Sequence, residues 1–137
     1  MGHEGESNLE HALKNLDWSL PEPEQQAARR YLVAHIGGDL SPLMVANLSK
    51  VQFENAALVL AEIGRPRIDA YIAPMLVWFL DRNWPGAQII AELLLGGNSK
   101  VLLQHLDLAL KQAADIDDEG WIYFLNEFKE EILQKNS

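Results

Sequence analysis

Residues 80–87 (LDRNWPGA) decide the fold that the sequence predicts. An apolar segment precedes this stretch, and residues 88–95 form a second apolar segment that ends at Gly96-Gly97. Asn83 and Trp84 come directly before Pro85, and proline is favoured in the first turn of a helix. The stretch therefore predicts a tight turn between two apolar helices.

Apolar residues recur at helical spacing along the rest of the chain, and no segment alternates with a period of two. Proline and glycine divide this pattern into separate helices. We expect the helices at about residues 8–16, 21–36, 42–48, 52–63, 68–80, 85–95, 99–114 and 120–133. Pro74 is expected to kink the helix over 68–80, or to mark where a short first turn gives way to the helix proper. The sequence predicts an all-α protein.

The composition indicates one globular domain, because 137 residues with 48% apolar side chains can bury a core without disulfides or a structural metal. The chain has no cysteine, which excludes disulfides, thiolate zinc sites and a cysteine nucleophile. This composition fits a reducing cytoplasm.

The chain is acidic, with 20 acidic against 11 basic residues and a formal charge of −9. This charge repels phosphate backbones, so we expect no binding of nucleic acid. It favours a basic protein partner, although it can equally serve only to keep a small domain soluble.

The first residues are acidic and lack the basic and apolar regions of a signal peptide. The longest apolar run, residues 71–80, is half the length that a bilayer crossing needs. We expect no membrane segment and a cytoplasmic protein.

Two segments of the chain resemble one another. Residues 55–62 (NAALVLAE) and 85–92 (PGAQIIAE) share an Ala-x-x-x-Ala-Glu core, and Gly64 and Gly96 follow them. A weaker copy begins at Gly120-Trp121. Helix pairs that recur in this way are typical of an α-solenoid. We expect about three antiparallel helix pairs, at residues 41–66, 67–98 and 99–134, with residues 1–40 as an N-terminal helical cap.

The segment 72–81, the Asn-Trp-Pro turn at 83–85 and the segment 87–96 together resemble a HEAT repeat. Residues 71–128 are also similar to a family of small uncharacterised bacterial proteins, a domain of unknown function. That family has an Asn-Trp-Pro-x-Ala motif and a late Trp-x-Tyr segment, here residues 121–123. Several of its members resemble immunity proteins, which bind and neutralise a toxin. The resemblance implies a HEAT-like fold and a protein partner, and it implies no catalytic residue.

Residues 115–122 (DIDDEGWI) are similar to the opening of a calcium-binding EF-hand loop. The twelfth position should be a bidentate glutamate, but it is Asn126. We therefore interpret Asp117, Asp118 and Glu119 as acids that favour the positive N-terminus of the last helix. The four histidines show no metal-ligand spacing. We expect no metal, no cofactor and no enzymatic activity.

Candidate contact residues follow from helix position. Glu62 and Glu92 match in the repeat and could form an acidic stripe or be ordinary solvated residues. Trp78 lies off the face of Leu76 and Phe79 in an α-helix, so we expect it to be an exposed aromatic anchor. The full set of partner-binding candidates is Glu54, Glu62, Trp78, Gln88, Glu92, Tyr123 and Glu127.

The sequence thus favours a non-enzymatic protein-binding module, an immunity-type inhibitor whose acidic helical face binds a basic protein such as a toxin. The alternative is a structural or oligomerisation subunit of a larger assembly. The pattern is compatible with a monomer or a homodimer. An enzyme would need a cluster of polar groups that the sequence does not display.

Overall fold

The computed structural model describes the backbone of residues 3–136 and the side chains of residues 8–136. This part of the chain contains helices and no strand, which confirms the all-α prediction. The α-helices are α1 (His3–Lys14), α2 (Glu22–His35), α3 (Phe53–Ile63), α4 (Ile72–Met75), α5 (Ala87–Leu95), α6 (Ser99–Asp115) and α7 (Glu119–Lys135).

The segment expected as a helix over 42–48 is broken into short 3₁₀ pieces, so that expectation is wrong. The segment expected as a helix over 68–80 is helical throughout, but it changes from 3₁₀ to α and back to 3₁₀ around Pro74 and is not one regular α-helix. The short 3₁₀-helices are η1 (Ser41–Leu43), η2 (Val45–Asn47), η3 (Lys50–Gln52), η4 (Arg67–Tyr71) and η5 (Leu76–Leu80). Met44 and Leu48 interrupt the first segment with extended backbone, at ψ 147° and 160°. In the second, α4 has only four residues and contains Pro74. Because proline lacks an N–H and crowds the preceding turn, it disfavours a longer α-helix at this point.

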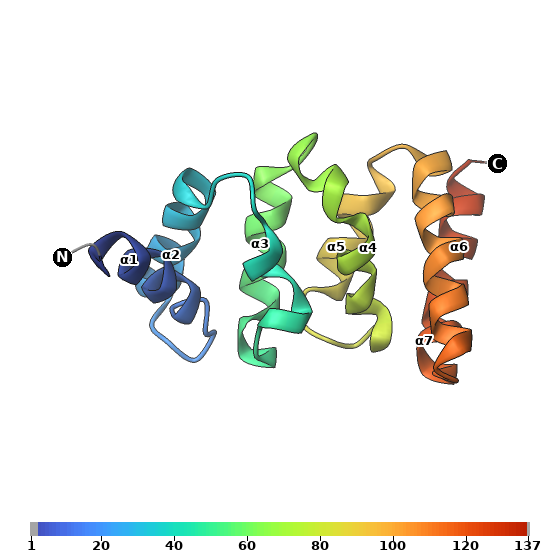
Figure 1. Cartoon of the computed structure of the whole chain (residues 1–137), viewed down its shortest axis with the longest axis horizontal. Helices are drawn as coiled ribbons and strands as arrows, with labels where there is room; N and C mark the ends of the chain where they lie inside the picture. Colours follow the sequence, from blue (N-terminus) through green and yellow to red (C-terminus); the bar gives the residue numbers. More distant parts are fainter. Residues whose placement is uncertain (1–2, 137) are drawn as a thin grey trace.

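The elements follow one another in a row, with α1 at one end and α7 at the other (Figure 1). α2 packs against α1 and α3, α3 packs against α5, and α4 and η5 pack against α6 and α7. α3, α5 and α7 run in the same direction, opposite to the segments that precede them (Figure 1). None of the helices within residues 3–136 combines the length and the apolar character that a membrane crossing requires.

Burial along the second half of this row repeats every 34 residues. On α3, α5 and α7 the matching buried residues are Phe53, Ala57 and Leu60, then Ala87, Ala91 and Leu94, then Trp121, Leu125 and Phe128. The segments before α5 and α7 match in the same way, with Ile68, Ile72, Met75 and Phe79 against Leu102, Leu106, Ala109 and Ala113. Residues 34 positions apart in these segments are therefore buried alike.

This register differs from the one that aligns Glu62 with Glu92, which are 30 residues apart. In the shorter register exposed Ala61 would match fully buried Ala91. In the 34-residue register Glu92 corresponds to Leu58. The expected equivalence of the two glutamates is therefore wrong, because alanine occupies both faces of these helices and a match of composition does not fix which face is buried.

Trp78 is fully buried, so the expectation of an exposed anchor is wrong. The reason is the 3₁₀ geometry of η5, in which residues three apart eclipse one another. Trp78 consequently lies in line with Met75, which is also fully buried. Its ring packs edge-on against Phe53 of α3, with the ring centroids 6.1 Å apart.

Candidate functional site

The exposed surface of α3 and α5 carries four of the candidate contact residues. Glu54 and Glu62 lie on α3, Gln88 and Glu92 lie on α5, and all four side chains are exposed. The two helices pack side by side. We call these four residues, together with Leu58, the acidic helical surface.

The carboxylates of this surface, those of Glu54, Glu62 and Glu92, form no ion pair within the part of the chain that the structure describes. Carboxylates on neighbouring helices repel one another and attract cations from solution. The three carboxylates are therefore available to pair with lysine or arginine side chains of a partner.

Leu58 is an apolar member of this surface that the sequence analysis missed. It lies on α3 between Glu54 and Glu62 and is 39% exposed. The sequence pattern indicates its exposure, because Leu58 lies outside the buried helical face formed by Phe53, Ala57 and Leu60. An exposed leucine bordered by charged groups resembles the apolar centre and polar rim of a protein interface.

The two candidates on α7 have different surroundings. Tyr123 is 64% exposed and stacks edge-on with Phe124, with the ring centroids 5.3 Å apart. Glu127 lies 3.2 Å from Arg82, so its charge is already paired within the molecule. The structure therefore exposes Glu54, Glu62, Gln88 and Glu92 on two helices that pack side by side, places Tyr123 and Glu127 on α7, and removes Trp78 from the surface.

Arg82 connects the turn at residues 80–87 to α7. Its Nη1 and Nη2 donate to the two carboxylate oxygens of Glu131 at 2.7 and 2.9 Å, and Nη1 also reaches Glu127. The guanidinium lies 5.0 Å from the ring centroid of Phe79 and 5.8 Å from that of Phe128. The hydrogen bonds with Glu131 raise the pKa of Arg82, although burial opposes this. This network holds the third and fourth turns of α7 against the turn at residues 80–87, and no sequence pattern indicated it.

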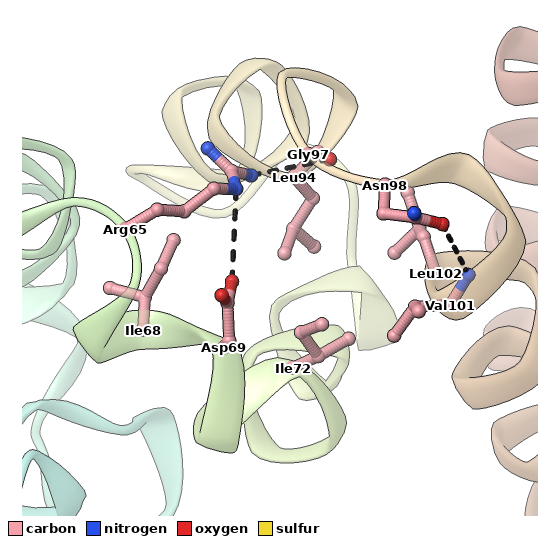
Figure 2. A pocket seen from close by; sticks show the side chains of 9 residues that line it. All are labelled: Arg65, Ile68, Asp69, Ile72, Leu94, Gly97, Asn98, Val101 and Leu102. Atoms are coloured by element: carbon pink, nitrogen blue, oxygen red, sulfur yellow. Dashed lines mark hydrogen bonds and ion pairs between the residues drawn. The ribbon is translucent and has the colours of Figure 1, made fainter.

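An apolar cleft opens at one edge of the row, between η4, the end of α5 and the start of α6 (Figure 2). It encloses about 390 Å³. Its lining residues are Arg65, Ile68, Asp69, Ile72, Leu94, Gly97, Asn98, Val101 and Leu102. Leu94 and Glu92 point to opposite faces of α5, so the cleft is separate from the acidic helical surface.

The polar groups of this cleft form hydrogen bonds and an ion pair with one another and with the neighbouring backbone. Arg65 Nη2 donates to the carbonyl oxygens of Leu93 and Leu94 at the end of α5, and Arg65 Nε lies 3.8 Å from Asp69 (Figure 2). A cation at this position complements the negative end of the helix. Asn98 accepts a hydrogen bond from the N–H of Val101 at 3.0 Å and caps α6. The cleft therefore offers apolar walls and paired charges, which suit an apolar group.

The acidic loop before α7 behaves as a helix cap. Asp118 accepts a hydrogen bond from the N–H of Trp121 at 3.0 Å. No group of three or more histidine, aspartate or glutamate side chains within the described residues is arranged to hold a metal ion.

Comparison with known proteins gives no match, whether with protein-family models, curated proteins or solved structures. The resemblance to HEAT repeats and to immunity proteins therefore stays a prediction.

Proposed function

We propose that the protein is a short α-solenoid of about three HEAT-like helix pairs, with residues 1–40 as an N-terminal cap. Two observations support this architecture. Burial repeats every 34 residues from Phe53 to Ala87 and from Ala87 to Trp121. The elements also form a single row in which α3, α5 and α7 share one direction (Figure 1). Such stacks commonly expose an extended surface that binds other macromolecules.

We further propose that the protein is a non-enzymatic binding module whose acidic helical surface binds a basic protein. The observation that carries this proposal is the set of three exposed carboxylates, Glu54, Glu62 and Glu92, that have no ion pair with any described residue. The resemblance to immunity proteins suggests that the partner is a toxin that this protein inhibits in the cytoplasm.

The physical basis of binding would be charge attraction around an apolar contact. Opposite charges speed the encounter of two proteins, and this acceleration falls as salt rises. Leu58 would supply the desolvated contact at the centre of the surface. A basic partner should therefore associate rapidly at low salt and lose affinity when either the salt or the surface charge is changed.

The test is affinity capture from a lysate of the source organism, at low and at moderate salt. The tagged wild-type protein is compared with the double variant Glu62→Lys with Glu92→Lys. A matched control, Glu10→Lys with Asp115→Lys, makes the same change of net charge at exposed positions outside the acidic helical surface.

We expect one basic protein to be recovered by the wild type and by the control, and to be lost with the test variant and at moderate salt. Recovery of the bait alone would overturn the proposal and favour the structural or oligomeric alternative. Equal loss with both double variants would also overturn it, because the effect would then come from net charge and not from this surface.

A further inference from the structure

α1 and α2 lie at the end of the row away from α7 (Figure 1). Residues of both helices line a hollow. It encloses about 260 Å³. Ala12 from α1 and Ala27 and Ala28 from α2 line it, and their single-carbon side chains leave the space open. The hollow is therefore built by small residues on the facing sides of two packed helices.

The polar groups around this hollow attract positive charge. Glu24 lines it with an exposed carboxylate that forms no ion pair with any described residue. Asn15 also lines it, and its Nδ2 donates to Nε2 of His11 at 3.2 Å, which leaves the amide oxygen as an acceptor. No lysine or arginine is among the lining residues.

Tyr31 contributes an aromatic wall. Tyr31 is among the lining residues, and its ring contacts that of His35 in a tilted arrangement, with the ring centroids 4.5 Å apart. The face of a tyrosine ring attracts an ammonium or a guanidinium through its quadrupole. A carboxylate and an acceptor oxygen around an alanine floor, with a tyrosine in the lining, form a site for an organic cation with an apolar stem.

We propose that this hollow binds the ammonium or guanidinium group of a slender alkyl chain, with the charge at Glu24 and the stem against the alanines. The cation can be a free alkyl amine or the lysine or arginine side chain of a polypeptide. The site shares no residue with the acidic helical surface, so it does not depend on the proposed function.

The test is a titration of the full chain, followed by the backbone amide signals of Ala27 and Tyr31 in two-dimensional NMR spectra. The probes are n-butylammonium and n-butylguanidinium, with n-butanol and butyrate as neutral and anionic analogues. The variants are Glu24→Gln, which removes the charge, and Ala27→Leu, which fills the hollow from an exposed position. Matched controls are Glu10→Gln and Ala34→Leu, both at exposed positions outside the hollow.

We expect saturable shifts with the two cations and none with butanol or butyrate. Glu24→Gln should weaken binding about fivefold, the scale of an exposed ion pair. Ala27→Leu should abolish the shifts while its spectrum stays that of a folded protein, and both controls should bind as the wild type does.

A lysine blocked at its amino and carboxyl groups distinguishes the two sources of the cation. Binding as tight as that of n-butylammonium assigns the site to a polypeptide side chain, and binding of n-butylammonium alone assigns it to a free amine. Shifts that do not saturate, that butanol reproduces, that keep the wild-type affinity in Glu24→Gln, or that persist in Ala27→Leu would overturn the proposal.

Discussion

The indole N–H of Trp78 donates a hydrogen bond of 3.0 Å to the carbonyl oxygen of Pro85. Trp78 lies in the core, and Pro85 comes two residues before α5. The bond therefore ties the end of the turn at residues 80–87 to the core. Trp84, in the same turn, packs on Phe53 of α3 with the ring centroids 5.2 Å apart. The turn is thus both a local structure and a contact between α3 and the segment before α5.

Replacing Trp78 with phenylalanine should destabilise the protein by about 1–3 kcal/mol, because the partly buried carbonyl of Pro85 loses its donor. The free energy of unfolding can be measured by urea denaturation. Trp18→Phe is the matched control, since Trp18 is 45% exposed. It should change stability by less than about 0.5 kcal/mol. Equal losses in the two variants would show that the bond of Trp78 adds nothing.

Gly86→Ala should lower the free energy of unfolding by more than about 2 kcal/mol, because the backbone here is left-handed and the added Cβ clashes with its neighbours. Gly86 has φ 88°, and an added Cβ would lie 2.8 Å from Cβ of Ala57 and 2.9 Å from the carbonyl oxygen of Phe53. The control is Gly38→Ala, where a Cβ meets no atom within 4 Å. Thermal unfolding should separate the variants clearly, and a Gly86→Ala protein as stable as the control would contradict the close packing of the turn.

Asn55→Ala should lower the free energy of unfolding by about 2–4 kcal/mol, because it leaves buried partners without hydrogen bonds. Asn55 is buried and donates to the carbonyl oxygen of Leu16 at 2.7 Å and to Oε1 of Gln25 at 2.9 Å. It also accepts from Arg29 at 2.6 Å. Asn126→Ala on α7 is an exposed control that should be nearly neutral. A small effect at Asn55 would mean that water replaces it.

Glu131→Gln should destabilise the protein more than Glu127→Gln does. Glu131 receives two hydrogen bonds from the mostly buried guanidinium of Arg82, whereas Glu127 receives one and is 45% exposed. We expect about 1–3 kcal/mol for Glu131→Gln and less than about 1 kcal/mol for Glu127→Gln. The reverse order in urea denaturation would show that Glu127 is the main partner of Arg82.

Asp39 should contribute to the loss of stability in acid. The hydroxyl of Ser41, at 2.6 Å, and then its N–H, at 3.0 Å, lower the pKa of this carboxyl. Because the folded pKa is lowered, the contribution is present above the ordinary aspartate pKa of about 4 and is lost as the pH falls through the lowered folded value. Ser41→Ala should raise the pKa of Asp39 toward its ordinary value and flatten the acid dependence of stability.

An NMR titration of the aspartate carboxyl carbons measures this effect directly. Asp17, whose pKa Ser19 lowers in the same way, is an internal control that should not change in Ser41→Ala. A pKa of Asp39 that stays low in the variant would contradict the role of Ser41.

The candidate surface was predictable in part. The sequence indicates Glu54, Glu62, Gln88 and Glu92 as solvent-facing residues, because they lie off the apolar faces of their helices, and the structure exposes all four. Leu58 follows from the same reasoning but was overlooked. The ion-pair partner of a charged residue could not be predicted in this way. Only the packing of η5 on α7 shows that Glu127 is paired with Arg82.

The sequence by itself determined the local structure. Apolar spacing, prolines and glycines specify the all-α class, the turn at residues 80–87 and the stop at Gly64, because these depend on residues within a few positions of one another. Around Pro74 the 3₁₀ turns shift the helical phase, so only the tertiary structure decided which face of this segment is buried. For this reason Trp78 lies in the core. It also decided the partners of Asn55 and Arg82, which come from elements 26 to 49 residues away. Such contacts depend on how distant elements meet, which is set by the packing of the whole chain.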